Sequence, residues 1–171
     1  PEDIEHRLED IAEGCKALVV AFICNHCPYV KLIADRFGEM GNELAAQGVA
    51  VVAINSNDAD AHPDDSPEAM ADEIALRGYR FPYLFDGTQE VARAYHAACT
   101  PDFFVFDSSL RLAYRGRFDQ SRPGNGETVT GADLAAAVEA IAAGGTPAGP
   151  QAPSMGCNIK WRPGNEPTWF A

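Results

Sequence analysis

Two cysteines separated by two residues carry the most specific chemistry in this sequence. Cys24 and Cys27 enclose the dipeptide Asn25-His26 and directly follow an apolar run. A Cys-x-x-Cys pair between a buried strand and a helix is typical of thiol–disulfide chemistry. The free N–H groups and the positive end of a helix favour a thiolate. We therefore expect Cys24 to be the exposed nucleophile at the helix N-cap, and Cys27 to be a shielded resolving thiol.

His26 lies between the two cysteines, where its charge affects their reactivity. A protonated imidazole beside the Cys24 thiolate lowers the pKa of this thiol and makes the disulfide more oxidising. Other interpretations of the pair remain open: half of a zinc site, a copper(I) site, or two inert core cysteines. Zinc is disfavoured because no second Cys-x-x-Cys and no His-x-x-x-His is present. We expect neither a metal nor a cofactor.

Three further cysteines, Cys15, Cys99 and Cys157, have less specific surroundings. Cys15 precedes the first apolar run and is expected to be structural. Cys99 is either a third redox thiol or a small loop residue, and the sequence favours neither. Cys157 is either a resolving thiol on a mobile tail or a packing residue, and packing is favoured.

The apolar pattern predicts alternating strands and helices. A run such as residues 17–23, apolar at every position, is typical of a strand that is buried on both faces. Parallel strand–helix–strand units followed by a hairpin and a last helix predict a three-layer α/β/α sandwich. The strands are expected at 17–23, 49–54, 81–85, 102–107 and 110–118, and the helices within 3–13 and at 29–47, 66–78, 88–95 and 130–144.

Length and charge narrow the class of protein. The 171 residues predict one domain over residues 1–144, followed by a tail over 145–171. The net charge of −12 disfavours nucleic acid as a partner. The longest apolar run is too short for a membrane span, and the first ten residues hold no signal-peptide pattern, so a cytoplasmic protein is expected.

The tail is rich in Pro, Gly and Asn, yet it holds both tryptophans. So much apolar area is expected to pack on the domain or on a partner. Its prolines limit large movements, so we expect a strap docked away from the dithiol, with an inert Cys157, rather than an arm that exchanges with Cys24. The large apolar residues of the tail are Ile159, Trp161, Trp169 and Phe170.

Several segments of the chain resemble the thioredoxin superfamily, and within it the peroxiredoxin-like (alkyl hydroperoxide reductase/thiol-specific antioxidant) branch. The resemblance implies that a cis-proline substrate loop, Thr100-Pro101, faces the dithiol. It implies a thiol–disulfide oxidoreductase, with a peroxide reductase or a thiolate metal-binding module as alternatives. The matching segments are FICNHCPYV (22–30), CTP (99–101), INSND (54–58), YRGRFD (114–119), SRPGN (121–125) and PSMGCNIKW (153–161).

The chain also departs from these families. Peroxiredoxins carry Pro-x-x-x-Thr-x-x-Cys, and an alignment on Cys27 places Val20 and Cys24 at the Pro and Thr positions. Peroxidase activity is therefore expected to be weak. Thioredoxins carry a buried Asp six residues before the first cysteine, where this chain has Leu18. The sequence thus leaves the proton acceptor of the dithiol unidentified.

Two charged segments complete the candidate site. Arg117, Asp119 and Arg122 follow the predicted hairpin as either a charged rim that steers substrates or an ordinary solvated loop. Residues 55–65 form an Asp-rich loop with His62, which is expected to border the substrate groove rather than bind calcium. The expected partner is a protein or small-molecule thiol or disulfide. The electron donor is not indicated, and a homodimer is left open.

Overall fold

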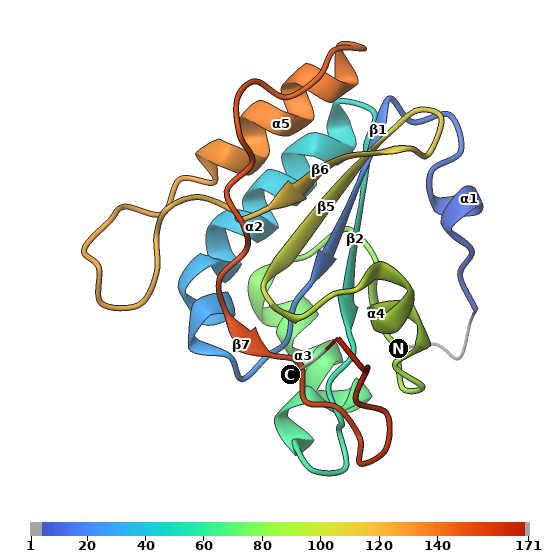
Figure 1. The fold of residues 1–171 in the computed structure, drawn as a ribbon, viewed down its shortest axis with the longest axis vertical. Coiled ribbons are helices and arrows are strands. Elements are labelled where there is room, and N and C mark those ends of the chain that lie inside the picture. Colours follow the sequence, from blue (N-terminus) through green and yellow to red (C-terminus); the bar gives the residue numbers. More distant parts are fainter. Residues whose placement is uncertain (1–4, 170–171) are drawn as a thin grey trace.

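The computed structural model describes residues 5–169 and is built around a five-stranded sheet of order β3-β2-β1-β5-β6. The central strand β1 is buried along its whole length because its residues are apolar on both faces. β1 pairs with β2 in parallel and with β5 antiparallel (Figure 1). The strands of this sheet are β1 (Ala17–Phe22), β2 (Val49–Asn55), β3 (Tyr83–Phe85), β5 (Asp102–Asp107) and β6 (Leu112–Gly116).

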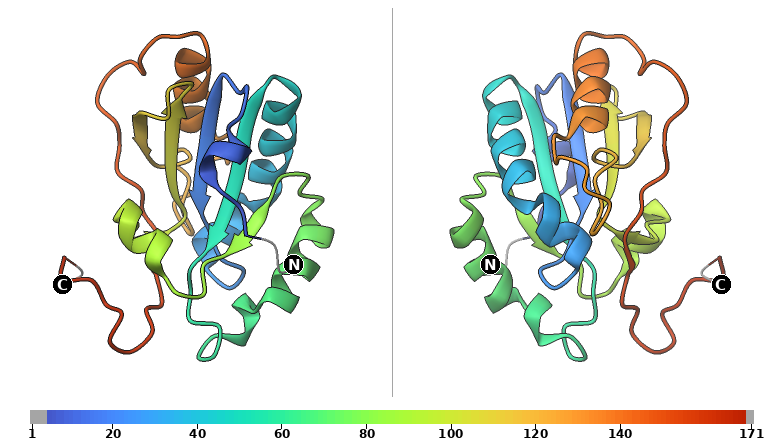
Figure 2. Two further views of the ribbon diagram at one scale, coloured as in Figure 1. Left: turned by 90° about the vertical axis from the view of Figure 1, so that its right-hand side faces the viewer. Right: turned by 90° about the vertical axis from the view of Figure 1, so that its left-hand side faces the viewer.

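Helices cover both faces of the sheet, as expected of a three-layer sandwich. Alternate side chains of β1 point to opposite layers: Val19 and Ala21 lie in the core with α2 and α5, whereas Val20 lies in the core with α1 and α4. Figures 1 and 2 show these helix pairs on opposite sides of the sheet. The helices are α1 (Leu8–Ile11), α2 (Pro28–Ala46), η1 (Pro63–Asp65), α3 (Pro67–Arg77), α4 (Glu90–Tyr95) and α5 (Ala132–Ala142).

The predicted fold class is confirmed, and the differences are local. The helix expected within residues 3–13 forms one turn, α1, and residues 3 and 4 lie outside the described part of the chain. The first strand of the hairpin is found at Asp102–Asp107, as predicted. The second is shorter than the predicted 110–118 and covers Leu112–Gly116. No helix among residues 5–169 is both long and apolar enough to span a membrane.

The described part of the tail returns along the domain and adds a small second sheet. β7 (Cys157–Asn158) pairs antiparallel with β4 (Cys99–Thr100), just before the β5 strand. Ile159 is buried in the core on the α4 side of the sheet. Figure 1 shows the tail passing from the end of α5 along the sheet edge to β7. Phe170 lies outside the described residues.

Candidate redox site

The two cysteines of the Cys-x-x-Cys pair lie in the turn between β1 and α2, and both are buried. Cys24 is 2% exposed and Cys27 is fully buried. Two expectations are therefore wrong: Cys24 is not exposed, and it is not the helix N-cap. Proline lacks an N–H group and suits the first helical position, so α2 begins at Pro28 and the N-cap falls on Cys27.

The cis-proline loop holds both sulfur atoms. The Thr100–Pro101 peptide bond is cis, in the loop that the resemblance to the thioredoxin superfamily placed opposite the dithiol. Cys24 Sγ lies 3.2 Å from Thr100 Oγ1, and Cys27 Sγ lies 3.3 Å from the Thr100 carbonyl oxygen. One residue of the loop therefore contacts both thiols, although 76 positions separate it from Cys24.

Hydrogen bonds decide how the reduced pair shares its negative charge. The thiol of Cys24 lowers the pKa of Cys27 to about 4 despite burial, with further help from Cys157 and from the Val30 backbone. Donation to Cys27, then burial and the charge of Asp65, raise the pKa of Cys24 far above its ordinary value. The Thr100 carbonyl oxygen can accept a hydrogen bond only from a protonated Cys27 thiol, so it acts against the groups that lower the pKa of Cys27. These contacts favour the negative charge on Cys27, whereas the sequence led us to expect it on Cys24.

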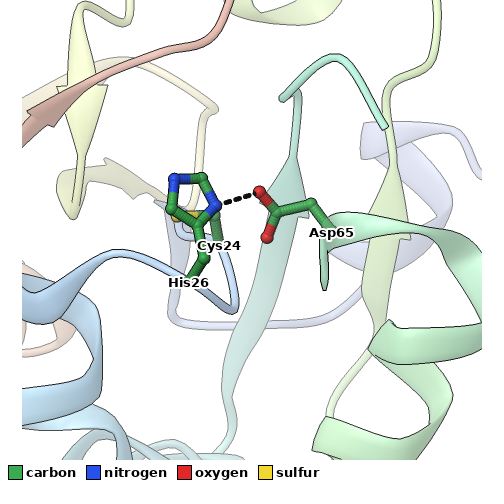
Figure 3. Close-up of side chains that lie close together, drawn as sticks. All are labelled: Cys24, His26 and Asp65. Carbon is green, nitrogen blue, oxygen red and sulfur yellow. Dashed lines mark hydrogen bonds and ion pairs between the residues drawn. The ribbon is translucent and has the colours of Figure 1, made fainter. Parts of the chain in front are cut away.

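A buried carboxylate anchors the histidine between the cysteines. His26 Nδ1 lies 2.5 Å from Oδ2 of Asp65, a residue of η1 that is fully buried (Figure 3). Asp65 also accepts hydrogen bonds from the Asn25 N–H at 2.7 Å and from the Asn57 amide at 2.8 Å. These donors compensate the burial of the carboxylate and fix the orientation of the imidazole.

Asp65 is a site residue that sequence reasoning did not identify. It comes from the Asp-rich loop after β2, which the sequence did place near the substrate groove. His62 of the same loop stacks on His26, with 5.1 Å between the ring centroids. One pattern in the sequence could have identified Asp65. The dithiol follows β1 and the polar loop follows β2, and these strands are adjacent and parallel, so their carboxyl ends lie at the same edge of the sheet.

Cys24, His26 and Asp65 also form the cluster best suited to a metal among the described residues. One ligand atom from each lies within 4.8 Å of the other two. Thiolate, imidazole and carboxylate are donors that zinc accepts. A metal ion there would have to replace the hydrogen bond between His26 and Asp65.

The tail docks beside the dithiol, so the expectation of a strap placed elsewhere is wrong. Thr100, which contacts both sulfurs, is opposite Cys157 in the β4–β7 ladder. The partner of Cys99 in this ladder is Asn158. The Cys99 thiol lies 3.7 Å from the Pro101 carbonyl oxygen, and burial raises its pKa to about 12. Cys157 thus lies closer to the chemistry than its place in a proline-rich tail indicated.

The charged residues after β6 lie near Pro101 but are largely engaged. Arg117 Nε lies 2.5 Å from the Asp133 carboxylate. Asp119 accepts hydrogen bonds from the backbone N–H groups that lead into α5, which gives it a structural role in that loop. Arg122 Nη1 lies 3.3 Å from the sulfur of Met155. These residues line a cavity of about 50 Å³ that Pro101 also lines.

Comparisons with known proteins agree with this fold. Two solved structures match closely over 92% of this chain, each with a TM-score of 0.89. One is a hypothetical protein from Sinorhizobium meliloti 1021, 53% identical, of which 85% is covered. The other is an uncharacterized conserved protein from Geobacillus kaustophilus, 51% identical, of which 83% is covered. No curated protein matches the chain.

More distant structures share the fold alone. A thioredoxin-like protein solved in its oxidised form is 18% identical over 82% of this chain and 87% of its own, with a TM-score of 0.64. The fold and the dithiol therefore define a protein of the thioredoxin superfamily. The AhpC/TSA family model matches residues 2–115, so the chain belongs to the AhpC/TSA family. This membership supports a redox function.

Proposed function

We propose that the protein is a thiol–disulfide oxidoreductase whose working groups are Cys24 and Cys27. The observation that carries the proposal is the convergence of both sulfurs on Thr100, beside the cis proline. Two thiols at the end of a strand, one of them at a helix N-cap, are arranged to cycle between dithiol and disulfide. The substrate is a disulfide of a protein or a small molecule.

The charge distribution assigns a role to each sulfur. The Cys27 thiolate attacks one sulfur of the substrate disulfide, forms a mixed disulfide with it and releases the other half as a thiolate. Cys24 then loses its proton and attacks Cys27 Sγ, which releases the second half. The cysteines lose two electrons and form one disulfide, and the substrate disulfide gains two electrons and becomes two thiols.

The pair of His26 and Asp65 serves the second attack. Cys24 is protonated in the reduced site, so its attack needs a proton acceptor, and the imidazole is within 4.8 Å of its sulfur. Asp65 orients this imidazole and compensates the positive charge that forms on it. The proton then passes from His26 to the departing thiolate.

Trapping of the mixed disulfide tests the proposal and the roles. The substrate is a peptide disulfide, and quenched samples of the Cys24→Ser and Cys27→Ser variants are compared by mass spectrometry. We expect Cys24→Ser, combined with Cys157→Ser so that no second thiol can resolve it, to accumulate a mixed disulfide on Cys27, and Cys27→Ser to accumulate none. Cys15→Ser is the matched control, because Cys15 precedes β1 and lies outside the site.

Two results of this experiment count against the proposal. A mixed disulfide that accumulates on Cys24 in the Cys27→Ser variant would return the attacking role to Cys24. The function itself is overturned if the wild-type protein neither reduces the peptide nor forms a disulfide between Cys24 and Cys27.

A peroxide reductase is the second candidate, and the low pKa of Cys27 favours it. A thiolate attacks the O–O bond of a peroxide, becomes a sulfenic acid and releases an alcohol or water. Cys24 then condenses with the sulfenic acid, which forms the Cys24–Cys27 disulfide and releases water. Val20 and Cys24 replace the residues that activate peroxide in peroxiredoxins, so we expect slow oxidation by hydrogen peroxide in stopped-flow measurements. A rate like that of dedicated peroxidases would make this candidate the preferred one.

A further inference from the structure

The buried dithiol poses a problem of access. Cys24 is 2% exposed and Cys27 has no exposed surface, so substrate and reductant alike reach these sulfurs only after a local rearrangement. β7 pairs with the loop that contacts both sulfurs, and its Cys157 is partly exposed. Of the three cysteines that contact Thr100 or pair with it, Cys157 is therefore the one that is not buried.

Backbone contacts on both sides fix the position of Cys157. A side chain at Gly156 would have its Cβ 2.0 Å from the Thr100 carbonyl oxygen, so the tail approaches this loop as closely as glycine permits. Beyond Cys157, the Ile159 N–H donates to the Ala98 carbonyl at 3.1 Å, and the Ile159 side chain is 2% exposed. The ladder and this buried anchor hold Cys157 opposite Thr100.

Cys27 is the sulfur that Cys24 and Cys157 share. Cys27 Sγ lies 3.3 Å from the Thr100 carbonyl oxygen, and Cys157 is opposite Thr100 in the ladder. Cys157 also packs against the core cluster that contains Cys24 and Cys27. Cysteines gathered in this way are placed for disulfide exchange after a small rearrangement. Cys27 thus has two candidate disulfide partners, one on each side.

We propose that Cys157 is a third redox thiol, which takes the disulfide from Cys24–Cys27 and presents it to a thiol reductant in solution. The inference rests on the proposed function, because the substrate disulfide first oxidises Cys24 and Cys27. It adds the route by which the oxidised protein is reduced again.

The exchange is balanced at each step. The Cys157 thiolate attacks Cys27 Sγ, the Cys24–Cys27 bond breaks, and Cys24 leaves and takes up a proton. A reductant thiolate then attacks the partly exposed Cys157 Sγ, and Cys27 leaves as a thiolate. A second reductant thiolate attacks the mixed disulfide on its reductant sulfur, which frees Cys157 and yields the oxidised reductant. Two electrons pass from two reductant thiols to one protein disulfide.

The protonation of Cys157 explains why this exchange follows oxidation. Burial, followed by the hydrogen bond to Cys27 and the negative charge of Cys27, raises the pKa of Cys157 to about 11. Both contributions from Cys27 end when Cys27 enters a disulfide, because its charge is lost. Cys157 therefore becomes a better nucleophile once the Cys24–Cys27 bond has formed. The low pKa of Cys27 then makes it a good leaving group in the next step.

Two measurements on the full chain test this route. The protein is oxidised, and its disulfides are mapped by mass spectrometry of non-reduced peptides. We expect a mixture of Cys24–Cys27 and Cys27–Cys157 in the wild type, and Cys27–Cys157 alone in the Cys24→Ser variant. The rate of reduction of the oxidised protein by glutathione is then measured. We expect Cys157→Ser to be reduced about tenfold more slowly than wild type, and Cys15→Ser to match wild type.

The outcomes separate this inference from the function on which it rests. If Cys24–Cys27 forms and turns over, but no Cys27–Cys157 disulfide appears and Cys157→Ser is reduced as fast as wild type, the relay is overturned and the function stands. If Cys24–Cys27 never forms, the proposed function fails and the relay fails with it. Cys157→Ala, measured alongside, shows whether slow reduction follows from the loss of the sulfur. It must behave like Cys157→Ser for the relay to hold.

Discussion

Within the site, single atoms determine which cysteine carries the charge. Cys27 has the helix N-cap position, the Val30 backbone and two neighbouring thiols as donors. Cys24 has the buried Asp65 carboxylate near it, and a negative neighbour disfavours a thiolate. These two environments move the pKa values of adjacent thiols in opposite directions. The same contacts leave Cys24 in need of a proton acceptor.

The first prediction concerns the titration of Cys27. The reduced wild-type protein should absorb at about 240 nm as a thiolate at pH values far below the ordinary thiol pKa of about 8.5. The thiolate signal rises with pH, with its first midpoint near the Cys27 pKa of about 4. Cys27→Ser should remove this step, and Cys157→Ser should move its midpoint upward because a donor is lost. A reduced protein without thiolate absorbance below pH 7 would contradict the charge assignment.

The second prediction concerns Asp65. Asp65→Asn keeps the size of the side chain but removes the charge that compensates a protonated His26. Attack by Cys24 should slow about tenfold, and the mixed disulfide on Cys27 should last longer in quenched single-turnover experiments. Asp64→Asn is the matched control, because Asp64 is exposed and contributes its backbone carbonyl to Asn25. Equal rates in the two variants would show that Asp65 does not serve the second attack.

At the scale of the elements, β1 and α2 place the two cysteines, and short elements bring the other site residues to them. β1 and α2 fix the two cysteines, and η1 brings Asp65 to His26. The two-residue strands β4 and β7 place Thr100 and Cys157 on either side of one ladder. The site therefore depends on four segments that meet at the carboxyl ends of β1 and β2.

The third prediction concerns the pairing of β4 and β7. Gly156→Ala adds a methyl group that overlaps the Thr100 carbonyl, so the ladder must open. We expect the free energy of unfolding in urea to fall by about 2 kcal/mol. Alkylation of the dithiol by iodoacetamide should become faster, since the loop that contacts both sulfurs loses its pairing with β7. Gly145→Ala, whose Cβ would have its nearest neighbour at 3.2 Å, should have a smaller effect on both measurements. Unchanged alkylation in Gly156→Ala would mean that β7 does not control access.

At the scale of the whole molecule, the negative net charge has more effect on an approaching charged substrate than the local cluster of arginines. The chain carries a net charge of −12. Arg117 is paired with Asp133, and Arg115 is paired with Asp102, so these cations are partly neutralised. A field that extends beyond the site is therefore negative, and it steers cations toward the protein.

The fourth prediction follows from this field. A disulfide peptide of positive net charge should be reduced faster at low salt than a matched acidic peptide. The difference should shrink as ionic strength rises from about 0.02 M to about 0.5 M, because screening shortens the range of the field. The measurement is kcat/KM for both peptides at each salt concentration. A preference for the acidic peptide at low salt would show that Arg117 and Arg122 dominate the approach instead.

The sequence by itself determined the fold and the position of the dithiol, because both rest on local patterns. Residues that are apolar at every position of 17–23 require a strand buried on both faces, and Cys24 and Cys27 follow it directly. The resemblance to the thioredoxin superfamily, and not a local pattern, placed Thr100 and Pro101 opposite the cysteines. Local sequence therefore located the dithiol, and the resemblance located the loop that faces it.

Only the tertiary structure revealed the surroundings of each sulfur, the partner of His26 and the place of the tail. Asp65 is 41 positions from Cys24, and Cys157 is 130 positions from Cys27, so no local pattern links either pair. A pKa depends on the atoms within a few ångströms, and these come from η1, β4 and β7. The proline content of the tail indicated stiffness but not direction. Its direction was set by the burial of Ile159 and by the close approach that Gly156 permits.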